Sequence, residues 1–483
     1  MTKHKHNKWI ILSIITLASF ITNVDATIVI IGLPKLMQDL HLSVDAGLWI
    51  ITSYAVTSTV FLLPAGKWAD MIGKKIIFIG GFTVFTIATI LCAIATSGFT
   101  IIPFRFLQGA GASMALATAT PIIMQTFEKK QLGLAISINA TSWVLGAIIG
   151  PVIGGALIDT LGWRSIFSLT APFAIAGSLL AVFFLPGDAT LRTKSKMDWR
   201  GLFTFSTALT SMLIVLSEGN KWGWTSYSII SLIAITFIGF ITFIYVEQNH
   251  ISPLFNLSLF SNRQYTTGLF ITLCYLIGYY SITFLLTIYL QGILQLDALH
   301  AGLLLIPLSL PQLILSPIFG SLVDRIGAPT LLFSGLLGQT LGLLILGTLN
   351  TKLSMPLLVI ALVIISASNS MAWPSLAKTI LETINLKEAG IASGMFFTIN
   401  YASRAVTQTL VLLFMEISVP AALVTTVMSD AAQTHSDLQI FSLVKAVDIS
   451  FYIFALFMFL AALLTTLLFK TKKRTIIDLQ SSR

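Results

Sequence analysis

Three charged side chains interrupt long apolar runs of this 483-residue chain: Asp25, Arg105 and Arg404. A charge at the centre of a membrane-spanning helix disfavours insertion by ~2.5–3.5 kcal/mol, so such a residue usually has a partner and a function. An arginine beside an aspartate in a medium of low dielectric constant keeps the carboxylate charged, and a proton or the loss of the arginine releases it. This pair of residue types can therefore bind and release a proton inside a membrane.

Asp25 and Arg105 are expected at nearly the same depth. The apolar run that holds Asp25 ends near Leu33, and the run that holds Arg105 begins near Phe99. At ~1.5 Å per helical residue, the two charges lie roughly 12 Å and roughly 9 Å below the same membrane edge. The pair is interpreted either as a proton-coupling site or as a static buried ion pair that fixes the helix register.

The composition is that of a protein that crosses the membrane many times. Hydrophobic residues make up 56% of the chain and charged residues 10%, with a mean hydropathy of +0.91, whereas soluble domains contain roughly 25% charged residues. In hydrocarbon such apolar runs form helices, because each backbone group must find its hydrogen bond within the protein. The sequence carries no nucleotide-binding loop or other enzyme motif, which argues against ATP-driven transport and against an enzyme.

We predict an all-α integral membrane fold with fourteen transmembrane helices, in which the seventh and eighth form an insert between two six-helix blocks. Each span holds about the number of apolar residues that crosses a bilayer. The expected spans are residues 9–33, 48–65, 76–96, 99–124, 132–158, 166–185, 201–216, 228–246, 266–290, 301–323, 330–349, 355–376, 389–416 and 449–469.

Basic residues in the loops predict the orientation. With the amino terminus inside the cell, the inner segments carry 21 lysines and arginines and the outer segments carry five. Because cytoplasmic loops are enriched in basic residues, both termini are predicted to be cytoplasmic. The net charge of +9 is scattered over many short loops, so no nucleic-acid partner is expected.

A short pattern repeats in two inner loops. GKWADMIGKK (66–75) and GSLVDRIG (320–327) share G-x-x-x-D-x-x-G, and each follows the second span of a six-span block. Two related halves around a central site are a transporter architecture. We therefore divide the chain into an amino-terminal six-helix bundle (1–186), an inner linker with the two-helix insert (187–263) and a carboxyl-terminal six-helix bundle (264–483).

A glycine-rich stretch, WVLGAIIGPVIGGAL (143–157), lies in the fifth span. Gly146, Gly150 and Gly154 fall four residues apart, with Pro151 and Gly155 among them. Small residues at this spacing let membrane helices approach closely, and a proline favours a kink. The stretch either takes part in coupling between the two halves or is ordinary helix packing.

Five motifs, in order along the chain, resemble those of the major facilitator superfamily. They are NVDATIVIIGLP (23–34), GKWADMIGKK, RFLQGAGAS (105–113), GAIIGPVIGG (146–155), and YLQ (289–291) with the run that follows it to SLVDRIG. The first and last are similar to its fourteen-helix branch, the drug:proton antiporter family 2 of multidrug efflux type. The resemblance implies the major facilitator fold, a central cavity beside Asp25 and Arg105, and packing of the glycine stretch against the tenth span.

The resemblance also implies an inner conformational latch made of Gly66, Asp70, Gly73, Lys74, Lys75, Asp324 and Arg325. Asp70 and Asp324 are expected in loops beside helix starts, where the helix dipole stabilises a carboxylate. For Asp324 and Arg325 a plain solvated loop is equally supported. The candidates for an aromatic and polar substrate cavity are Trp49, Tyr54, Gln108, Asn139, Trp143, Tyr275, Tyr279, Tyr280, Asn400, Tyr401 and Arg404.

These observations predict a proton-coupled exporter of lipophilic drugs or toxic compounds, an antiporter that works by alternating access. The proton gradient would drive it without a cofactor or metal, and its partners would be protons, membrane lipids and a small lipophilic substrate, with a cation as one option. We expect a monomer in the plasma membrane of a bacterium. A proton-coupled transporter of a dedicated metabolite or lipid is one alternative, and a non-transport membrane sensor or scaffold on the same fold is another.

Overall fold

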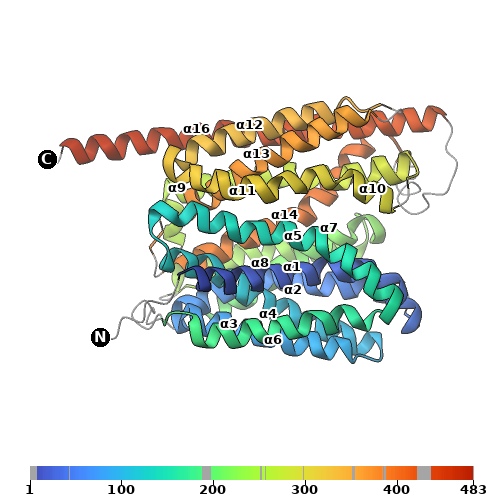
Figure 1. The fold of residues 1–483 in the computed structure, drawn as a ribbon, viewed down its shortest axis with the longest axis horizontal. Coiled ribbons are helices and arrows are strands. Elements are labelled where there is room, and N and C mark those ends of the chain that lie inside the picture. Colours follow the sequence, from blue (N-terminus) through green and yellow to red (C-terminus); the bar gives the residue numbers. More distant parts are fainter. Residues whose placement is uncertain are drawn as a thin grey trace. The chain divides into compact units, whose positions relative to one another are not determined.

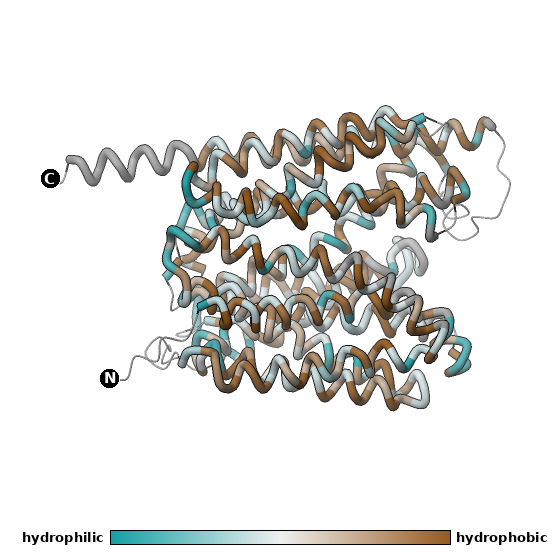
Figure 2. Tube along the Cα trace, viewed as in Figure 1, coloured by the Kyte–Doolittle hydropathy of each residue, from teal (hydrophilic) through white to brown (hydrophobic). Residues whose placement is uncertain are grey.

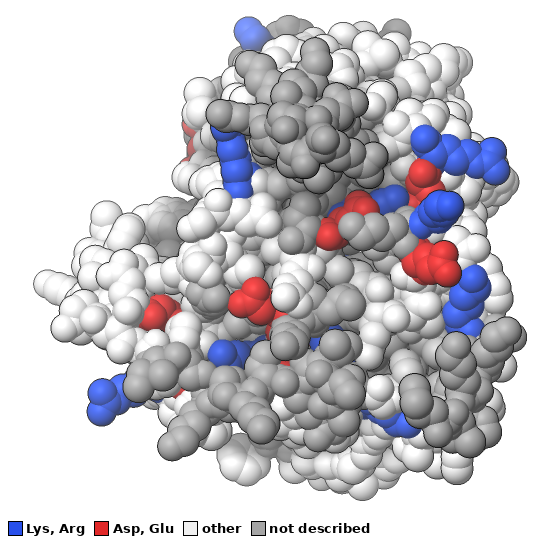
Figure 3. Space-filling view, turned by 90° about the vertical axis from the view of Figure 1, so that its left-hand side faces the viewer, with Lys and Arg blue, Asp and Glu red and all other residues white. Residues whose placement is uncertain are grey.

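The computed structural model describes residues 8–42, 44–187, 197–250, 253–255, 257–296, 298–350, 354–382, 384–385, 388–420 and 437–481. Within these ranges the chain forms helices and no strand (Figure 1). Hydrophobic residues run along the length of the helices (Figure 2). Charged side chains of both signs reach the surface at the helix ends drawn at the left of Figure 1 (Figure 3). The all-α membrane fold predicted from composition is thus confirmed.

The chain divides into two compact units. Unit 1 contains residues 1–261 and 381–401, and unit 2 contains residues 262–380 and 402–483. The insert helices therefore group with the amino-terminal helices. So does the first half of a late helix, α14 (Ala389–Glu416), whose second half belongs to unit 2.

Unit 1 is built on three helix pairs. α3 packs along α4, α2 packs along the same α4, and α1 packs along α5. The insert helices α7 and α8 pair with each other, and α7 also touches α2. The helices are α1 (Lys8–Asp39), α2 (Val44–Ile72), α3 (Lys74–Ala93), α4 (Gly98–Thr126), α5 (Lys129–Leu161), α6 (Arg164–Phe184), α7 (Trp199–Trp222) and α8 (Tyr227–Asn249), followed by the short η2 (Leu257–Ser261).

Unit 2 is centred on its last helix, which packs against both α9 and α12. Its elements are α9 (Arg263–Thr287), the π-helical η3 (Ile288–Ile293), α10 (Ala298–Leu304), α11 (Ile306–Ile326), α12 (Ala328–Leu346), α13 (Met355–Leu381) and α16 (Asp437–Ser481).

The repeated pattern G-x-x-x-D-x-x-G has the same backbone role in both units. Its last glycine is Gly73 between α2 and α3 and Gly327 between α11 and α12, with φ of 121° and 105°. Only glycine adopts such a φ without steric cost, so each glycine lets the chain leave one helix and begin the next at once. The aspartate of each pattern lies in the last turns of a helix, so the expectation of loop positions for Asp70 and Asp324 was wrong.

Several expected spans differ from the observed helices. The tenth span is broken at Leu305 into α10 and α11, because Pro307 cannot donate an amide hydrogen bond inside a helix. The ninth ends in a π-helical turn that holds the YLQ motif. The last span is the middle of a 45-residue helix.

Twelve of the described helices are long and apolar enough to cross a membrane. The helices α5 and α14, 33 and 28 residues long, are not among these twelve. The number of fourteen spans therefore stays a prediction.

The glycine stripe of α5 faces α1 within unit 1. A side chain at Gly146 would meet Asn23 and the backbone of Val24, and one at Gly150 would meet Thr27. Oγ1 of Thr27 also lies 3.3 Å from the carbonyl oxygen of Gly146. Bare glycine surfaces thus allow the close approach of α1 and α5, which small residues permit between membrane helices.

Gly154 continues this surface, since a side chain there would meet Ile28 of α1. The surroundings of Pro151 and Gly155 lie outside the described part of the chain. The expected packing of the stripe against the tenth span stays a prediction, because that span belongs to unit 2.

We predict that Gly150→Leu lowers the stability of the protein by ~1–3 kcal/mol, because the larger side chain must displace Thr27 or push α1 away from α5. Thermal unfolding of the purified protein in one detergent measures the change. Gly302→Leu on α10 is the matched control, since no described atom lies near the side chain that it adds. Equal melting temperatures for the two variants would contradict the packing role.

Candidate functional site

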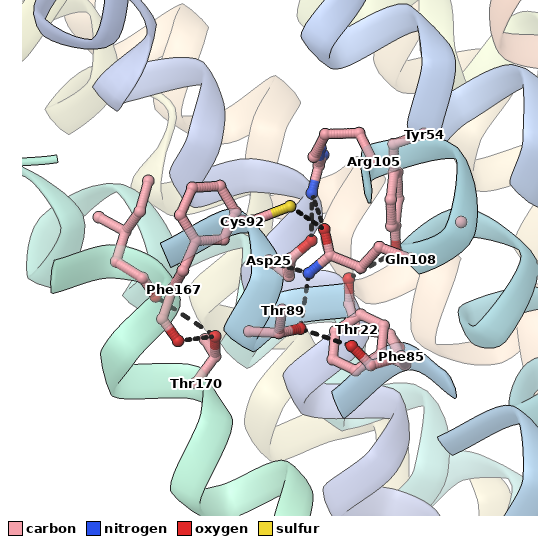
Figure 4. A network of polar contacts seen from close by, with 12 residues as sticks. Thr22, Asp25, Tyr54, Phe85, Thr89, Cys92, Arg105, Gln108, Phe167 and Thr170 are labelled. Atoms are coloured by element: carbon pink, nitrogen blue, oxygen red, sulfur yellow. Dashed lines mark hydrogen bonds and ion pairs between the residues drawn. The ribbon is translucent and has the colours of Figure 1, made fainter. Parts of the chain in front are cut away.

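Asp25 on α1 and Arg105 on α4 form a salt bridge inside unit 1. Nη1 of Arg105 lies 2.7 Å from Oδ2 of Asp25, and the two side chains are 1% and 0% exposed (Figure 4). The contact predicted from charge and depth is therefore present in the structure. A buried ion pair of this kind is stable only when its remaining polar atoms are also hydrogen-bonded.

Gln108 supplies much of that hydrogen bonding. Its Nε2 donates to Oδ1 of Asp25 at 2.8 Å and to Oγ1 of Thr89 at 2.7 Å, while its Oε1 accepts from Arg105 at 2.6 Å. Thr89 in turn donates to the carbonyl oxygen of Phe85. The amide cannot be reversed, because its NH₂ group would then face the guanidinium. Gln108 was expected in the substrate cavity, but it is fully buried in this network instead.

The other face of Arg105 is also occupied. Its Nε donates to the carbonyl oxygen of Ile50 at 3.1 Å, and its guanidinium lies 4.3 Å from the ring centre of Tyr54. Tyr54, another cavity candidate, is 4% exposed and donates its hydroxyl to the carbonyl oxygen of Thr22. Both oxygens of Asp25 thus accept hydrogen bonds from α4. A proton on Asp25 would remove the charge that holds Arg105 and so weaken the salt bridge.

Asp70 holds the start of α14. Its two carboxylate oxygens accept from the backbone amides of Gly390 and Ile391, at 2.9 and 2.8 Å. These amides belong to the first turn of a helix, where N–H groups have no partner within the helix and the dipole favours a negative charge. The carboxylate is therefore stabilised by the start of α14, a helix distant in the chain, which the sequence did not suggest.

Glycines make this contact possible. A side chain at Gly66 would overlap the backbone of Gly390, and one at Gly390 would overlap both Asp70 and the carbonyl oxygen of Gly66. A side chain at Gly394 would meet the carbonyl oxygen of Leu62 in the same way. The backbones of α2 and α14 therefore touch directly over two turns.

The two lysines of the motif differ. Nζ of Lys74 lies 3.7 Å from the carboxylate of Asp70, and both side chains are buried. Lys75 instead donates to the carbonyl oxygen of Leu185 at the end of α6, at 2.8 Å. Of these two lysines, Lys74 is the one whose charge lies beside Asp70.

The corresponding aspartate of unit 2 makes a different contact. Asp324 forms a salt bridge of 2.6 Å with Lys378 of α13, and the two side chains are 6% and 9% exposed. Asp324 is therefore no part of a solvated loop. Arg325 beside it is exposed.

Two of the remaining cavity candidates of unit 1, Trp143 of α5 and Tyr401 of α14, contact each other. The ring of Trp143 stacks on Phe397 at 6.0 Å and meets Tyr401 edge-on at 6.2 Å. Asn139, one turn earlier on α5, has a buried Oδ1 that accepts no hydrogen bond from the described residues. Asn400 is buried beside this group, and Trp49 of α2 is half-buried.

The candidates of unit 2 form an aromatic group of their own. Tyr275 stacks on Tyr279 at 6.0 Å, and Tyr279 meets Tyr280. The guanidinium of Arg404 lies 4.9 Å from the ring centre of Tyr280. Tyr275 also donates its hydroxyl to Asn369 of α13. A cationic and an aromatic side chain thus lie together in each unit.

The profile of the family described as Major Facilitator Superfamily matches residues 15–408, which is most of the chain. The chain belongs to the Major Facilitator Superfamily. It is a transporter and not an enzyme. The multidrug transporter protein MdtP of Bacillus subtilis is 31% identical over 387 residues, which are 79% of this chain and 71% of that protein.

Two further proteins are similar to this chain, one in sequence and one in fold. The riboflavin transporter RibZ of Clostridioides difficile is 30% identical over 402 residues, which are 82% of this chain and 86% of that protein. Among solved structures, the human organic anion transporter MFSD10 aligns with a TM-score of 0.67 at 14% identity, covering 95% of this chain and 99% of that chain. The last likeness concerns the fold alone.

Sequence reasoning missed three functional contacts. Each is a hydrogen bond to a residue distant in the chain: Thr89 with Gln108, Gly390 with Asp70, and Lys378 with Asp324. Thr89 and Gly390 are uncharged, and Lys378 lies near a helix end. The buried position of Gln108 could have been found from its spacing, because residues 105 and 108 share one face of a helix. No comparable signal connects Asp70 with Gly390, which is 320 residues away.

We predict that Gln108→Met slows transport and weakens the ion pair, because Asp25 and Arg105 each lose a charge-assisted hydrogen bond worth ~1.5–3 kcal/mol. The variant should also change the pH dependence of transport, which a purely structural side chain would leave unshifted. Gln38→Met, at an exposed position of α1, is the matched control. A normal pH profile in Gln108→Met would show that the amide only fills space.

We further predict that Asp70→Asn loosens the start of α14. A carboxamide accepts through one oxygen and carries no charge, so the loss of up to ~2 kcal/mol changes the opening equilibrium by on the order of 30-fold. The measurement is maleimide labelling of Ser393→Cys, a fully buried position of α14, after Cys92 and Cys274 are replaced by serine. Asp324→Asn is the matched control, and equal labelling in both variants would contradict the latch.

Proposed function

We propose that this transporter is a proton-coupled antiporter that exports small lipophilic compounds. The observation that carries the proposal is the buried pair of Asp25 and Arg105, with both carboxylate oxygens held by donors from α4. Such a carboxylate changes partner when it takes up a proton, so one chemical event can move α1 against α4. A static pair that only fixes the helix register would have the same contacts, and experiment must separate the two.

The latch supports the alternating-access part of the proposal. Asp70 binds the start of α14 through its charge and two hydrogen bonds. These polar contacts can break without any rearrangement of packed apolar side chains. A contact of this type can form in one state and break in another at modest energetic cost. Proton uptake at Asp25 and release of the latch would then belong to different steps of one cycle.

The aromatic groups support a flat, apolar substrate. Rings at Trp143 and Phe397 in unit 1 and at Tyr275 and Tyr279 in unit 2 offer stacking surfaces, and small-molecule sites combine such surfaces with a few polar atoms. The unpaired Oδ1 of Asn139 is one such atom. The multidrug transporter of Bacillus subtilis favours a broad substrate range, whereas the riboflavin transporter favours a dedicated metabolite as the second candidate.

We further propose that the protein works as a monomer in the plasma membrane of a bacterium, with both termini in the cytoplasm. The distribution of lysine and arginine over the loops supports this orientation. The proton gradient would be the only driving force, so no cofactor enters the cycle.

Asp25→Asn tests the proposal. Asparagine has the shape of aspartate but cannot bind a proton, so the exchange removes only the proton step. Uphill export should therefore fall by at least ~10-fold, while downhill exchange continues. Proteoliposomes with an imposed pH gradient and ethidium as the probe separate the two activities, and riboflavin replaces ethidium in a parallel series. Asp39→Asn, at an exposed ion pair with Lys35, is the control.

Proton-driven concentration of either compound by Asp25→Asn at the wild-type level would overturn the coupling role. Uphill transport of riboflavin alone by the wild-type protein would favour the metabolite transporter over the drug exporter.

A further inference from the structure

A pair of buried carboxyl groups lies where α7 of the two-helix insert begins and α8 ends. Glu247, in the last turn of α8, is 3% exposed. Its Oε1 accepts from the amide of Leu254 at 3.1 Å and its Oε2 from the amide of Phe255 at 3.0 Å. Both oxygens of Glu247 are therefore occupied by the segment that returns from α8 toward unit 2.

Asp198 is the other carboxyl group. It is fully buried and caps the start of α7, because its Oδ1 accepts from the amide of Gly201 at 2.8 Å. Its Oδ2 has no hydrogen-bond partner among the described residues. Nδ1 of His250 lies 3.8 Å from Oδ2, beyond hydrogen-bonding distance. A buried carboxylate oxygen without a partner is rare, and it requires an explanation.

The two carboxyl groups face each other across Gly201. A side chain at Gly201 would lie 2.5 Å from Oε1 of Glu247 and 2.7 Å from Oδ2 of Asp198. The two oxygens are therefore no more than about 5 Å apart, and glycine leaves the space between them open. Two ionised carboxylates at this distance, away from water, repel each other strongly, and such pairs usually retain one proton.

One lysine of the described residues partly compensates this pair. Lys67 of α2 interacts electrostatically with Glu247 and Asp198, but also with Asp70 and Glu388. Its Nζ donates a hydrogen bond to the carbonyl oxygen of Pro253. His250, near Asp198, is about one-third exposed.

We propose that Asp198 and Glu247 form a proton-binding site in which the two carboxyl groups together hold one proton. Both oxygens of Glu247 accept backbone amides, whereas Oδ2 of Asp198 accepts no hydrogen bond from the described residues and lies across Gly201 from Glu247. A hydroxyl on one carboxyl group can donate toward the other. This site is separate from Asp25 and does not depend on transport.

The site would hold the end of the insert against the part of α2 that carries Lys67 and Asp70. The proton removes one of two like charges, so the return segment (253–255) stays bound to Glu247 and to Lys67. Loss of the proton adds a buried negative charge, which draws in water and loosens the segment. Lys67 follows Gly66 and lies one turn before Asp70. Its hydrogen bond to Pro253 therefore connects the end of the insert to the part of α2 that binds α14.

Two measurements on the intact protein in lipid nanodiscs test the proposal. Infrared spectra at about pH 7 should contain a protonated-carboxyl band that disappears in Asp198→Asn and remains in the control Asp39→Asn. Asparagine caps a helix as well as aspartate does, so the exchange should not unfold α7. Identical carboxyl bands in the wild-type protein and in Asp198→Asn would overturn the proposal.

The second measurement is amide hydrogen exchange of residues 254 and 255, with the variants compared at the same pH. Asp198→Asn resembles the protonated state, so at about pH 6 it should be protected as well as the wild type. At about pH 9 it should be protected at least ~10-fold more than the wild type. The control should follow the wild type at both values. If Asp198→Asn is less protected at both, Asp198 serves only as a cap and the proton site is wrong.

Discussion

The buried carboxylate of Asp25 determines how the first helices of unit 1 must be arranged. A charge in a medium of low dielectric constant needs an opposite charge and a full set of hydrogen bonds. Here α4 provides Arg105 and Gln108, α3 provides Thr89, and α2 provides the carbonyl oxygen of Ile50. Three helices thus converge on one carboxyl group of α1. Any change in its protonation alters contacts with all of them, which is what coupling between a proton and a conformational change requires.

The same physical rule applies to the two aspartates of the repeated pattern, which are compensated in different ways. Asp70 is held by the amides at the start of α14 and by Lys74, whereas Asp324, at the equivalent place in the repeated pattern, is held by Lys378. A helix start and a lysine both compensate a carboxylate, but they place different demands on the fold. The helix start requires the backbones to touch at Gly66 and Gly390, whereas a lysine needs only its long flexible side chain. The two halves share a sequence pattern without sharing a latch.

The sequence predicted what depends on composition and on residue type. Apolar runs indicated the helices, the repeated pattern indicated a junction between two spans, and the charges of Asp25 and Arg105 indicated a pair at one depth. It did not predict contacts that depend on tertiary packing. The partner of Asp70 is a backbone amide 320 residues away, and backbone amides carry no residue-type signal. Gln108 was assigned to the cavity because an uncharged polar residue in a membrane helix suits a ligand as well as an ion pair.

In the proposed antiport cycle, substrate and proton compete through Asp25. Thermodynamic linkage requires that a substrate which displaces the proton be displaced by it in return. The most direct measurement is proton release, followed with a pH-sensitive dye, when saturating ethidium is added to the purified protein in weak buffer. The account predicts release of up to about one proton per wild-type molecule and none from Asp25→Asn. Equal proton release from the two proteins, with ethidium bound to both, would contradict it.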